Sequence, residues 1–147
     1  MTEKTLLYRL FGWGKIPKRL RPVLEGEGIA LVDEGIGGSV TMRNFRAPGR
    51  RYSWRRTWFS GSLVLTEKRF WAFAFSKPLI SVPLDDDSMA QLHCGLLDNG
   101  NLGIRFDVAA FHDGWKGTIE CRFATDRASI FLDKVLASGA TAELKSG

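Results

Sequence analysis

Residues 102 to 108 read LGIRFDV, and residues 117 to 125 read GTIECRFAT. Apolar side chains occupy every second position in both stretches, and charged or small residues stand between them. This two-residue period is typical of strands that bury one face and expose the other to water. The alternation predicts an antiparallel β domain, in which Cys121 packs as a core residue in phase with Ile119 and Phe123.

Other short strands are predicted between Gly28 and Thr125, where glycine, proline and asparagine interrupt apolar runs. The Asn99-Gly100 pair predicts a hairpin turn because these residues tolerate positive φ angles, and the glycine-rich stretch 35–38 is expected to turn the first hairpin. The strand candidates are residues 28–34, 38–46, 52–65, 69–75, 79–84, 91–97, 102–108 and 117–125. Residues 70–75 are apolar at every position, which predicts a strand covered on both faces or one that presents aromatic side chains to a partner.

Helical spacing is confined to the two ends of the chain. Residues 2–13 carry one apolar helical face, and a second short turn is expected from Pro17 to Pro22. Near the carboxyl end, Thr125 or Asp126 is expected to cap a helix that stops at Gly139. The predicted organisation is an N-terminal helical segment (1–24) that packs on a barrel, a β domain (25–138) and a flexible tail (139–147).

Two stretches inside this region, GSLVLTEKRFWAF (61–73) and LISVPL (79–84), carry a family resemblance. In the first, a glycine opens a strand, a threonine closes it before a charged turn, and an aromatic residue begins the next strand; these residues are Gly61, Thr66, Arg69 and Phe70. Together with the single C-terminal helix, the pattern resembles the pleckstrin-homology superfold, above all its bacterial and GRAM-type branches, over residues 25–138.

The resemblance implies a partly open antiparallel barrel of about seven strands, closed at one end by the C-terminal helix. A resemblance of fold does not by itself give a function, because function depends on the site that the fold carries. Lipid-binding members of the family usually place lysines and arginines around the first hairpin turn. With that turn expected at residues 35–38, the basic residues of this chain would lie beyond it.

The composition fits one soluble globular domain. The chain has 147 residues, of which 44% are hydrophobic and 25% charged. Its sequence contains no apolar run long enough for a transmembrane segment or a secretory signal, so a cytoplasmic location is expected. The two cysteines, Cys94 and Cys121, lack the short spacing of a metal or redox motif and are expected to be free thiols.

The positive charge is concentrated in the first part of the chain. Residues 1–58 carry 12 basic and 5 acidic side chains, whereas residues 59–147 carry 9 basic and 11 acidic ones. This asymmetry favours an anionic partner, such as a membrane surface, nucleic acid or an acidic protein. The alternative is a basic face that is simply solvated.

The stretch GRRYSWRRTWF (49–59) interleaves four arginines with four aromatic residues. In an extended strand, Tyr52, Trp54, Arg56 and Trp58 would share one face. Arginine beside tryptophan suits an anionic interface, whereas the alternative places the tryptophans in the core with the arginines reaching outward. The candidate contact residues are Arg43, Arg46, Arg50, Arg51, Trp54, Arg55, Arg56 and Trp58.

Catalytic, cofactor and metal sites are not predicted. His93 and Cys94 are neighbours in a strand and should point to opposite faces, while His112 lies in a loop before an Asp-Gly turn. Zinc-type ligand spacing, a calcium loop and a glycine-rich phosphate loop are all lacking in the sequence.

The sequence thus predicts a binding or scaffolding module that contacts a protein partner or an anionic membrane through its basic, aromatic half. If the partner is a membrane, we expect peripheral binding to its inner surface. We expect no nucleic-acid partner, and the sequence leaves open whether the protein forms a homo-oligomer. The alternative is a calycin-like barrel that holds an apolar molecule among Trp71, Phe73, Phe75 and Trp58. A solid core would favour the module, and an open, aromatic-lined interior would favour the carrier.

Overall fold

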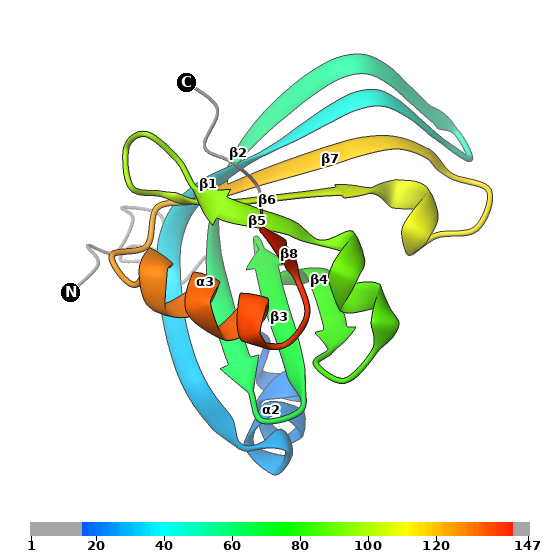
Figure 1. The fold of residues 1–147 in the computed structure, drawn as a ribbon. Helices are drawn as coiled ribbons and strands as arrows, with labels where there is room; N and C mark the ends of the chain where they lie inside the picture. The colour runs from blue at the N-terminus through cyan, green and yellow to red at the C-terminus, as the bar shows by residue number, and fades with distance from the viewer. Residues whose placement is uncertain (1–15, 143–147) are drawn as a thin grey trace.

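The computed structural model describes residues 16–142, which fold mainly into β-strands (Figure 1). The strands are β1 (Ile29–Ala47), β2 (Arg50–Thr66), β3 (Arg69–Ala74), β4 (Lys77–Pro83), β5 (His93–Leu96), β6 (Leu102–Asp107), β7 (Lys116–Phe123) and β8 (Thr141–Ala142). The α-helices are α2 (Arg21–Glu27) and α3 (Ala128–Ala137), and the 3-10 helices are η1 (Lys18–Leu20), η2 (Asp87–Gln91) and η3 (Val108–Ala110). The helix predicted at 2–13 lies outside the described residues.

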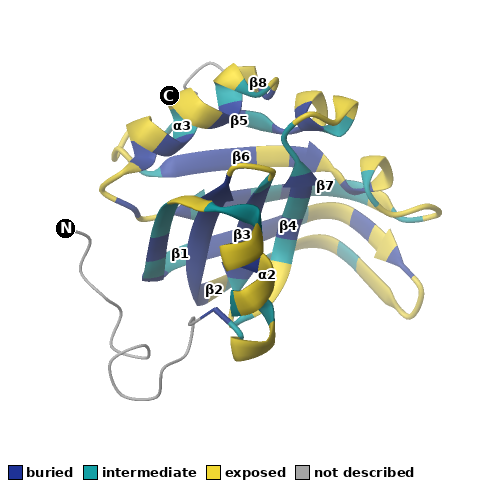
Figure 2. Ribbon diagram, turned by 90° about the horizontal axis from the view of Figure 1, so that it is seen from below, coloured by how far each residue is buried: buried dark blue, intermediate teal, exposed yellow. Residues whose placement is uncertain are grey.

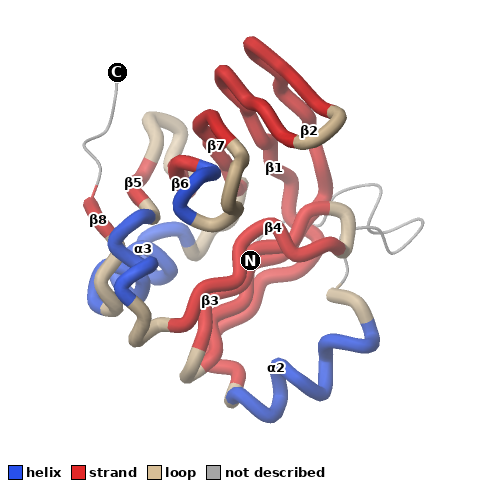
Figure 3. The backbone as a smooth tube through the Cα atoms, turned by 90° about the vertical axis from the view of Figure 1, so that its right-hand side faces the viewer, coloured by secondary structure: helices blue, strands red, loops and turns tan. Residues whose placement is uncertain are grey.

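All eight strands belong to one sheet, in the order β4-β3-β2-β1-β7-β6-β5-β8. Every neighbouring pair is antiparallel except β5 with β8. The sheet curls into a half-barrel, with β4 at one edge and β8 at the other (Figure 3). The predicted mainly β fold, with a partly open antiparallel barrel, a short N-terminal helix and a C-terminal helix, is confirmed.

The first hairpin turn differs from the prediction at residues 35–38, which was wrong. Strand β1 continues through these glycines, and a register shift against β2 between Glu34 and Ile36 marks an irregularity in the ladder. Gly35, with φ of 71°, bends the strand instead of reversing it. The chain turns back only after Ala47, which pairs with Arg50. The predicted strands 28–34 and 38–46 are therefore one long strand, and β1–β7 form a run of seven antiparallel strands.

Glycines allow the sheet to curl tightly around Phe59. A Cβ atom on Gly38 would lie 2.7 Å from the Phe59 ring and 2.5 Å from the carbonyl oxygen of Arg122. A Cβ on Gly61 would collide with the carbonyl of Phe73. The backbones can approach this closely only because both positions lack a side chain.

The inside of the half-barrel is filled by the main hydrophobic core. Figure 2 marks the buried residues of all strands in dark blue. Strands β1 to β7 contribute to it, and α3 adds Phe131 and Val135, which are 0% and 1% exposed. Cys121 lies in this core, as its phase predicted, and is fully buried.

A second, smaller cluster lies on the opposite face of β2 and β3. Trp71 and Phe73 stack there at 5.7 Å between ring centroids, and Leu24 of α2 packs against them. Residues 70–73 of the predicted apolar strand are therefore covered on both faces by their own chain, whereas Phe75 is exposed. Helix α2 extends further than the turn predicted at 17–22, because Pro22 stands at its first turn, where a proline is tolerated.

A polar network fastens α2 to the sheet. The hydroxyl of Thr66 accepts hydrogen bonds from the backbone N–H groups of Lys68 (3.2 Å) and Arg69 (2.8 Å), which forms the predicted turn between β2 and β3. The same hydroxyl donates to the Glu27 carboxylate at 2.8 Å, and Trp71 Nε1 donates to that carboxylate at 3.1 Å. Glu27 thus joins the end of α2 to two strands.

The carboxyl end departs from prediction at two places. Helix α3 takes Arg127 as its N-cap residue rather than Thr125 or Asp126. The Thr125 hydroxyl instead accepts from the Arg127 N–H at 3.1 Å and donates to the buried Asp33 carboxylate at 2.7 Å. Residues 141–142 of the predicted tail form β8, because the Thr141 N–H bonds the carbonyl of Leu92 next to β5.

The predicted turn at Asn99-Gly100 is confirmed. Gly100 has φ of 84°, and the Asn99 side chain accepts from the Asn101 N–H at 3.0 Å. The loop closes through a hydrogen bond of 2.8 Å from the Leu97 N–H to the Asn101 carbonyl.

Candidate functional site

The long β1–β2 hairpin carries all eight candidate contact residues. Its tip, at residues 47–50, extends away from α2 and α3 (Figure 1). Residues 35–66 include six arginines and no acidic residue. Since the first turn lies at this tip, the basic residues surround the first hairpin turn, contrary to the expectation that they follow it.

The two tryptophans of the hairpin are on the surface. Trp54 is 56% exposed and Trp58 is 70% exposed, so the interpretation of both as core residues was wrong. Across the ladder, Trp58 pairs with Ser39, Arg56 with Thr41 and Trp54 with Arg43. Trp54, Arg56 and Trp58 alternate along β2 and therefore lie on one face of the hairpin.

Tyr52 departs from this face. It is half-buried and stacks with Phe45 of the core at 6.0 Å between ring centroids. The ladder is irregular here, because Asn44 adopts φ of 51° and the register of β1 against β7 shifts between Arg43 and Arg46. This kink changes which side chains point inward near the tip, and a strict two-residue alternation could not anticipate it.

Two of the arginines are held beside aromatic rings. Arg56 donates from Nε to the Thr41 hydroxyl at 2.9 Å, and its guanidinium carbon lies 5.4 Å from the centroid of the Trp54 ring. Arg55 donates to the Tyr52 hydroxyl at 2.8 Å and lies 4.8 Å from that ring's centroid. Both contacts are of the cation–π type. They already restrict the two arginine side chains, so less conformational entropy is lost when these side chains bind a partner.

Negative charge near the hairpin comes from β7. Glu120 accepts from Arg122 at 3.2 Å and lies 3.7 Å from Arg43. In contrast, Arg46, Arg50 and Arg51 are exposed at the tip, and within residues 16–142 they form no ion pair. The positive field is therefore strongest at the tip. The sequence analysis had omitted Thr41 and Glu120, whose roles arise only from strand pairing.

Strands β1 and β7 place two further polar side chains in the same row of the sheet as Trp58. Ser39 pairs with Trp58 on one side and with Arg122 on the other. The Ser39 hydroxyl and Arg122 Nε are buried, and neither has a hydrogen-bond partner within the described part of the chain. Each can donate a hydrogen bond to an anionic oxygen if the side chains around it rearrange.

The other titratable candidates do not assemble into a site. Cys94 lies in the core while His93 reaches a small polar hollow with Arg105 and Asp107, so the two point to opposite faces as predicted. Both cysteines are free and buried. Burial, assisted by Glu120 and Cys94, raises the pKa of the Cys121 thiol far above its ordinary value, which keeps it protonated.

The four aromatic residues proposed for a ligand-filled barrel do not surround one space. Trp71 and Phe73 pack beneath α2, whereas Trp58 is on the surface and Phe75 is 41% exposed at the β3–β4 turn. A pocket lies elsewhere, between β4 and the η3–β7 connection, and is lined by residues including Leu79, Phe111 and His112.

Residues 16–142 contain no group of three or more histidine, cysteine, aspartate or glutamate side chains arranged to hold a metal ion. Within the same residues, no helix has the length and apolar character needed to cross a membrane. Comparison of the chain with protein-family models, with curated proteins and with solved structures found no match.

Proposed function

We propose that this protein is a non-enzymatic binding module, pleckstrin-homology-like in fold, whose β1–β2 hairpin docks on the surface of an anionic membrane. The observation that carries the proposal is the pair of exposed tryptophans, Trp54 and Trp58, on one face of a hairpin whose residues 35–66 include six arginines and no acidic residue. The fold assignment is supported by the seven consecutive antiparallel strands, the C-terminal helix and the basic residues around the first hairpin turn.

Each component of this surface suits a membrane interface. Tryptophan rings favour the headgroup level of a bilayer, because they are apolar over most of their area and polar at one edge. Arginine binds phosphate and carboxylate oxygens with two parallel hydrogen bonds and is less strongly hydrated than lysine. A basic side chain near an anionic membrane contributes about 1 kcal/mol. The tip arginines Arg46, Arg50 and Arg51, which form no ion pair with any residue from 16 to 142, therefore supply a useful share of the binding energy.

Vesicle flotation tests this proposal directly. The protein should float with phosphatidylcholine vesicles that contain phosphatidylserine, should stay in solution with phosphatidylcholine alone, and should bind less as the salt concentration rises from low to physiological. Equal binding to vesicles with and without phosphatidylserine would contradict the proposal. Failure to float with acidic vesicles at low salt would also contradict it, and would favour an acidic protein partner instead.

A pair of matched variants separates the hairpin from net charge. The first variant replaces four hairpin arginines: Arg50→Gln, Arg51→Gln, Arg55→Gln and Arg56→Gln. It should reduce vesicle affinity at low salt at least a hundredfold, because each basic side chain contributes about 1 kcal/mol to binding. The control makes the same change in net charge at exposed sites off the hairpin, at Lys18, Arg19, Lys68 and Lys134. The control should bind nearly as well as the unmodified protein, and equal losses in the two variants would show that the hairpin has no special part.

A further inference from the structure

The half-barrel is open along one side. Among the described strands, β4 is an edge of the sheet and pairs only with β3. Opposite it, across the mouth of the barrel, lie the end of β6 and the η3–β7 connection. A pocket of about 260 Å³ occupies this seam.

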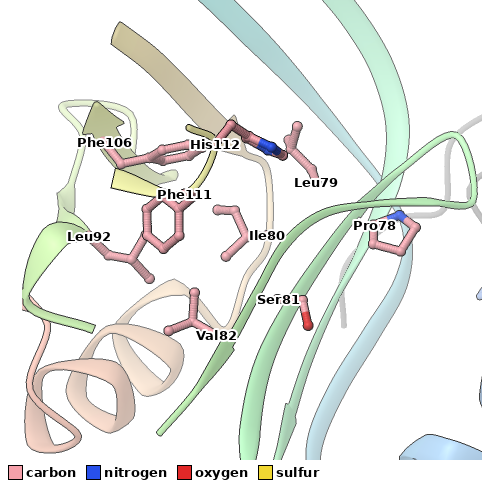
Figure 4. A pocket seen from close by; sticks show the side chains of 9 residues that line it. All are labelled: Pro78, Leu79, Ile80, Ser81, Val82, Leu92, Phe106, Phe111 and His112. Carbon is pink, nitrogen blue, oxygen red and sulfur yellow. The ribbon is translucent and has the colours of Figure 1, made fainter. Parts of the chain in front are cut away.

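Most of the side chains that line the pocket are apolar. Figure 4 shows Ile80, Val82, Leu92 and Phe111 directed toward a common space, with Leu79 and His112 at its rim. Ile80, Val82 and Leu92 are buried at the floor of the pocket, and Phe111 is half-buried.

Aromatic rings form one wall. Phe111 meets Phe106 edge to face, with 5.3 Å between ring centroids and 87° between planes. Aromatic rings in proteins favour such offset or edge contacts, so a third flat ring can add to this pair at little cost. The volume fits this kind of occupant, because a cavity of about 150 Å³ is enough for benzene.

One polar side chain faces the pocket. Of the residues that line it, only Ser81 and His112 have polar side chains. Ser81 points away from the space in Figure 4, and its hydroxyl accepts a hydrogen bond from Arg69 at 3.1 Å. The imidazole of His112 therefore stands alone at the rim as a group that can donate or accept.

The position of His112 is fixed by its neighbours. Its ring stacks on Trp115 with 4.3 Å between centroids and 17° between planes. Its backbone N–H donates to the Val108 carbonyl at 2.9 Å, and its carbonyl accepts from the Trp115 N–H at 3.2 Å. A polar group held in this way loses little freedom when it binds a ligand.

From these features we infer that the seam between β4 and η3 is a binding site for an apolar molecule of one or two aromatic rings that carries a single hydrogen-bonding group, which His112 meets. This site differs from the one in the carrier hypothesis, because none of Trp71, Phe73, Phe75 and Trp58 lines it. The inference is independent of membrane docking. The proposed docking hairpin is formed by β1 and β2, and no residue of these two strands lines the pocket.

Indole and indene are suitable probes, because the two molecules have nearly the same shape and only indole carries an N–H group. Titration of the ¹⁵N-labelled full chain with indole should shift amide signals of β4, η3 and residues 111–112, with a dissociation constant in the millimolar range or tighter. Indene should bind several times more weakly. Octanoate in place of indole tests an acyl chain, and binding of octanoate without indole would overturn the assignment to aromatic ligands.

Three variants complete the test. Leu79→Trp should fill the pocket and abolish the shifts, while Val23→Trp places the same side chain on an exposed position of α2 and should leave them intact. His112→Phe changes an exposed residue, so it should fold, and it should reduce the affinity for indole to that for indene. Absence of shifts in the pocket up to the solubility limit of indole, or indole binding unchanged in both Leu79→Trp and His112→Phe, would overturn the inference.

Discussion

The ring of Phe59 lies against Gly38 of the neighbouring strand, at a point where a Cβ atom would be only 2.7 Å from the ring. Phe59 also meets Phe123 of β7 edge to face at 5.6 Å. One side chain thus packs where β1, β2 and β7 converge. The close approach at Gly38 allows the sheet to curl around it rather than lie flat.

Gly38→Ala should therefore destabilise the protein by about 3 kcal/mol, the upper part of the range for overpacking a core. The free energy of unfolding in urea measures this. Gly26→Ala is the matched control, since a Cβ at Gly26 of α2 meets nothing within 4 Å and alanine favours a helix by about 0.5–1 kcal/mol. A Gly38→Ala protein as stable as the original would contradict the role given to this contact.

Trp54→Ala and Trp58→Ala should each leave the free energy of unfolding within about 0.5 kcal/mol, because both side chains are mostly exposed. Each should weaken binding to acidic vesicles roughly tenfold, as expected for loss of about 1.4 kcal/mol of interfacial burial. Trp71→Ala provides the contrast. It empties a buried position beneath α2 and should cost about 3–5 kcal/mol of stability. Loss of stability in Trp58→Ala would place that ring in the fold rather than at the interface.

Glu27→Ala should loosen α2 from the sheet. The substitution leaves the Trp71 N–H without its acceptor and the Arg69 guanidinium 3.8 Å away without its carboxylate. The Thr66 hydroxyl loses its bond to Glu27 and keeps the Arg69 carbonyl, at 3.1 Å, as an acceptor. We expect a loss of about 1–3 kcal/mol, together with a change in tryptophan fluorescence from Trp71. Glu25→Ala, on the exposed side of the same helix, should have little effect, and equal losses from both changes would argue against the network.

Cys94 and Cys121 should resist thiol reagents in the folded protein and react together when it unfolds, because both are buried. The raised pKa of Cys121 also predicts a pH dependence. The folded protein keeps this proton at a pH where the unfolded thiol, with an ordinary pKa of about 8.5, has lost it, so stability falls as the pH rises above that value.

Urea unfolding between about pH 8 and about pH 10 measures the effect, with Cys121→Ala as the comparison. The decline in stability should be smaller in Cys121→Ala, since the two proteins differ only at this residue. An identical decline would show that Cys121 contributes nothing to it.

Local patterns in the sequence were enough for most of the strands. The alternation at 102–108 and 117–125 predicted β6 and β7, and the Asn99-Gly100 and Thr66–Arg69 turns were recognisable from residues that favour turn conformations. These features depend on neighbours a few positions apart, which the sequence places together by itself.

Other features depend on residues far apart in the chain. Glycines at 35–38 suit a turn as well as a bend, and only the pairing of β1 with both β2 and β7 made this stretch the bend of one long strand. Because of the same pairing, the first turn lies at residues 47–50, and the arginines lie on both sides of it. The seam pocket joins β4 to the η3–β7 connection across the open barrel, so no local pattern could indicate it.

The sequence by itself determined the β character, the basic surplus of the first half and the Arg/Trp stretch, because each follows from composition or from a two-residue period. The tertiary structure decided which aromatic rings are buried. Trp71 and Trp58 both lie in predicted strands, yet α2 covers the first and leaves the second 70% exposed. Burial depends on what the fold brings over a side chain, and that information lies in contacts distant along the chain.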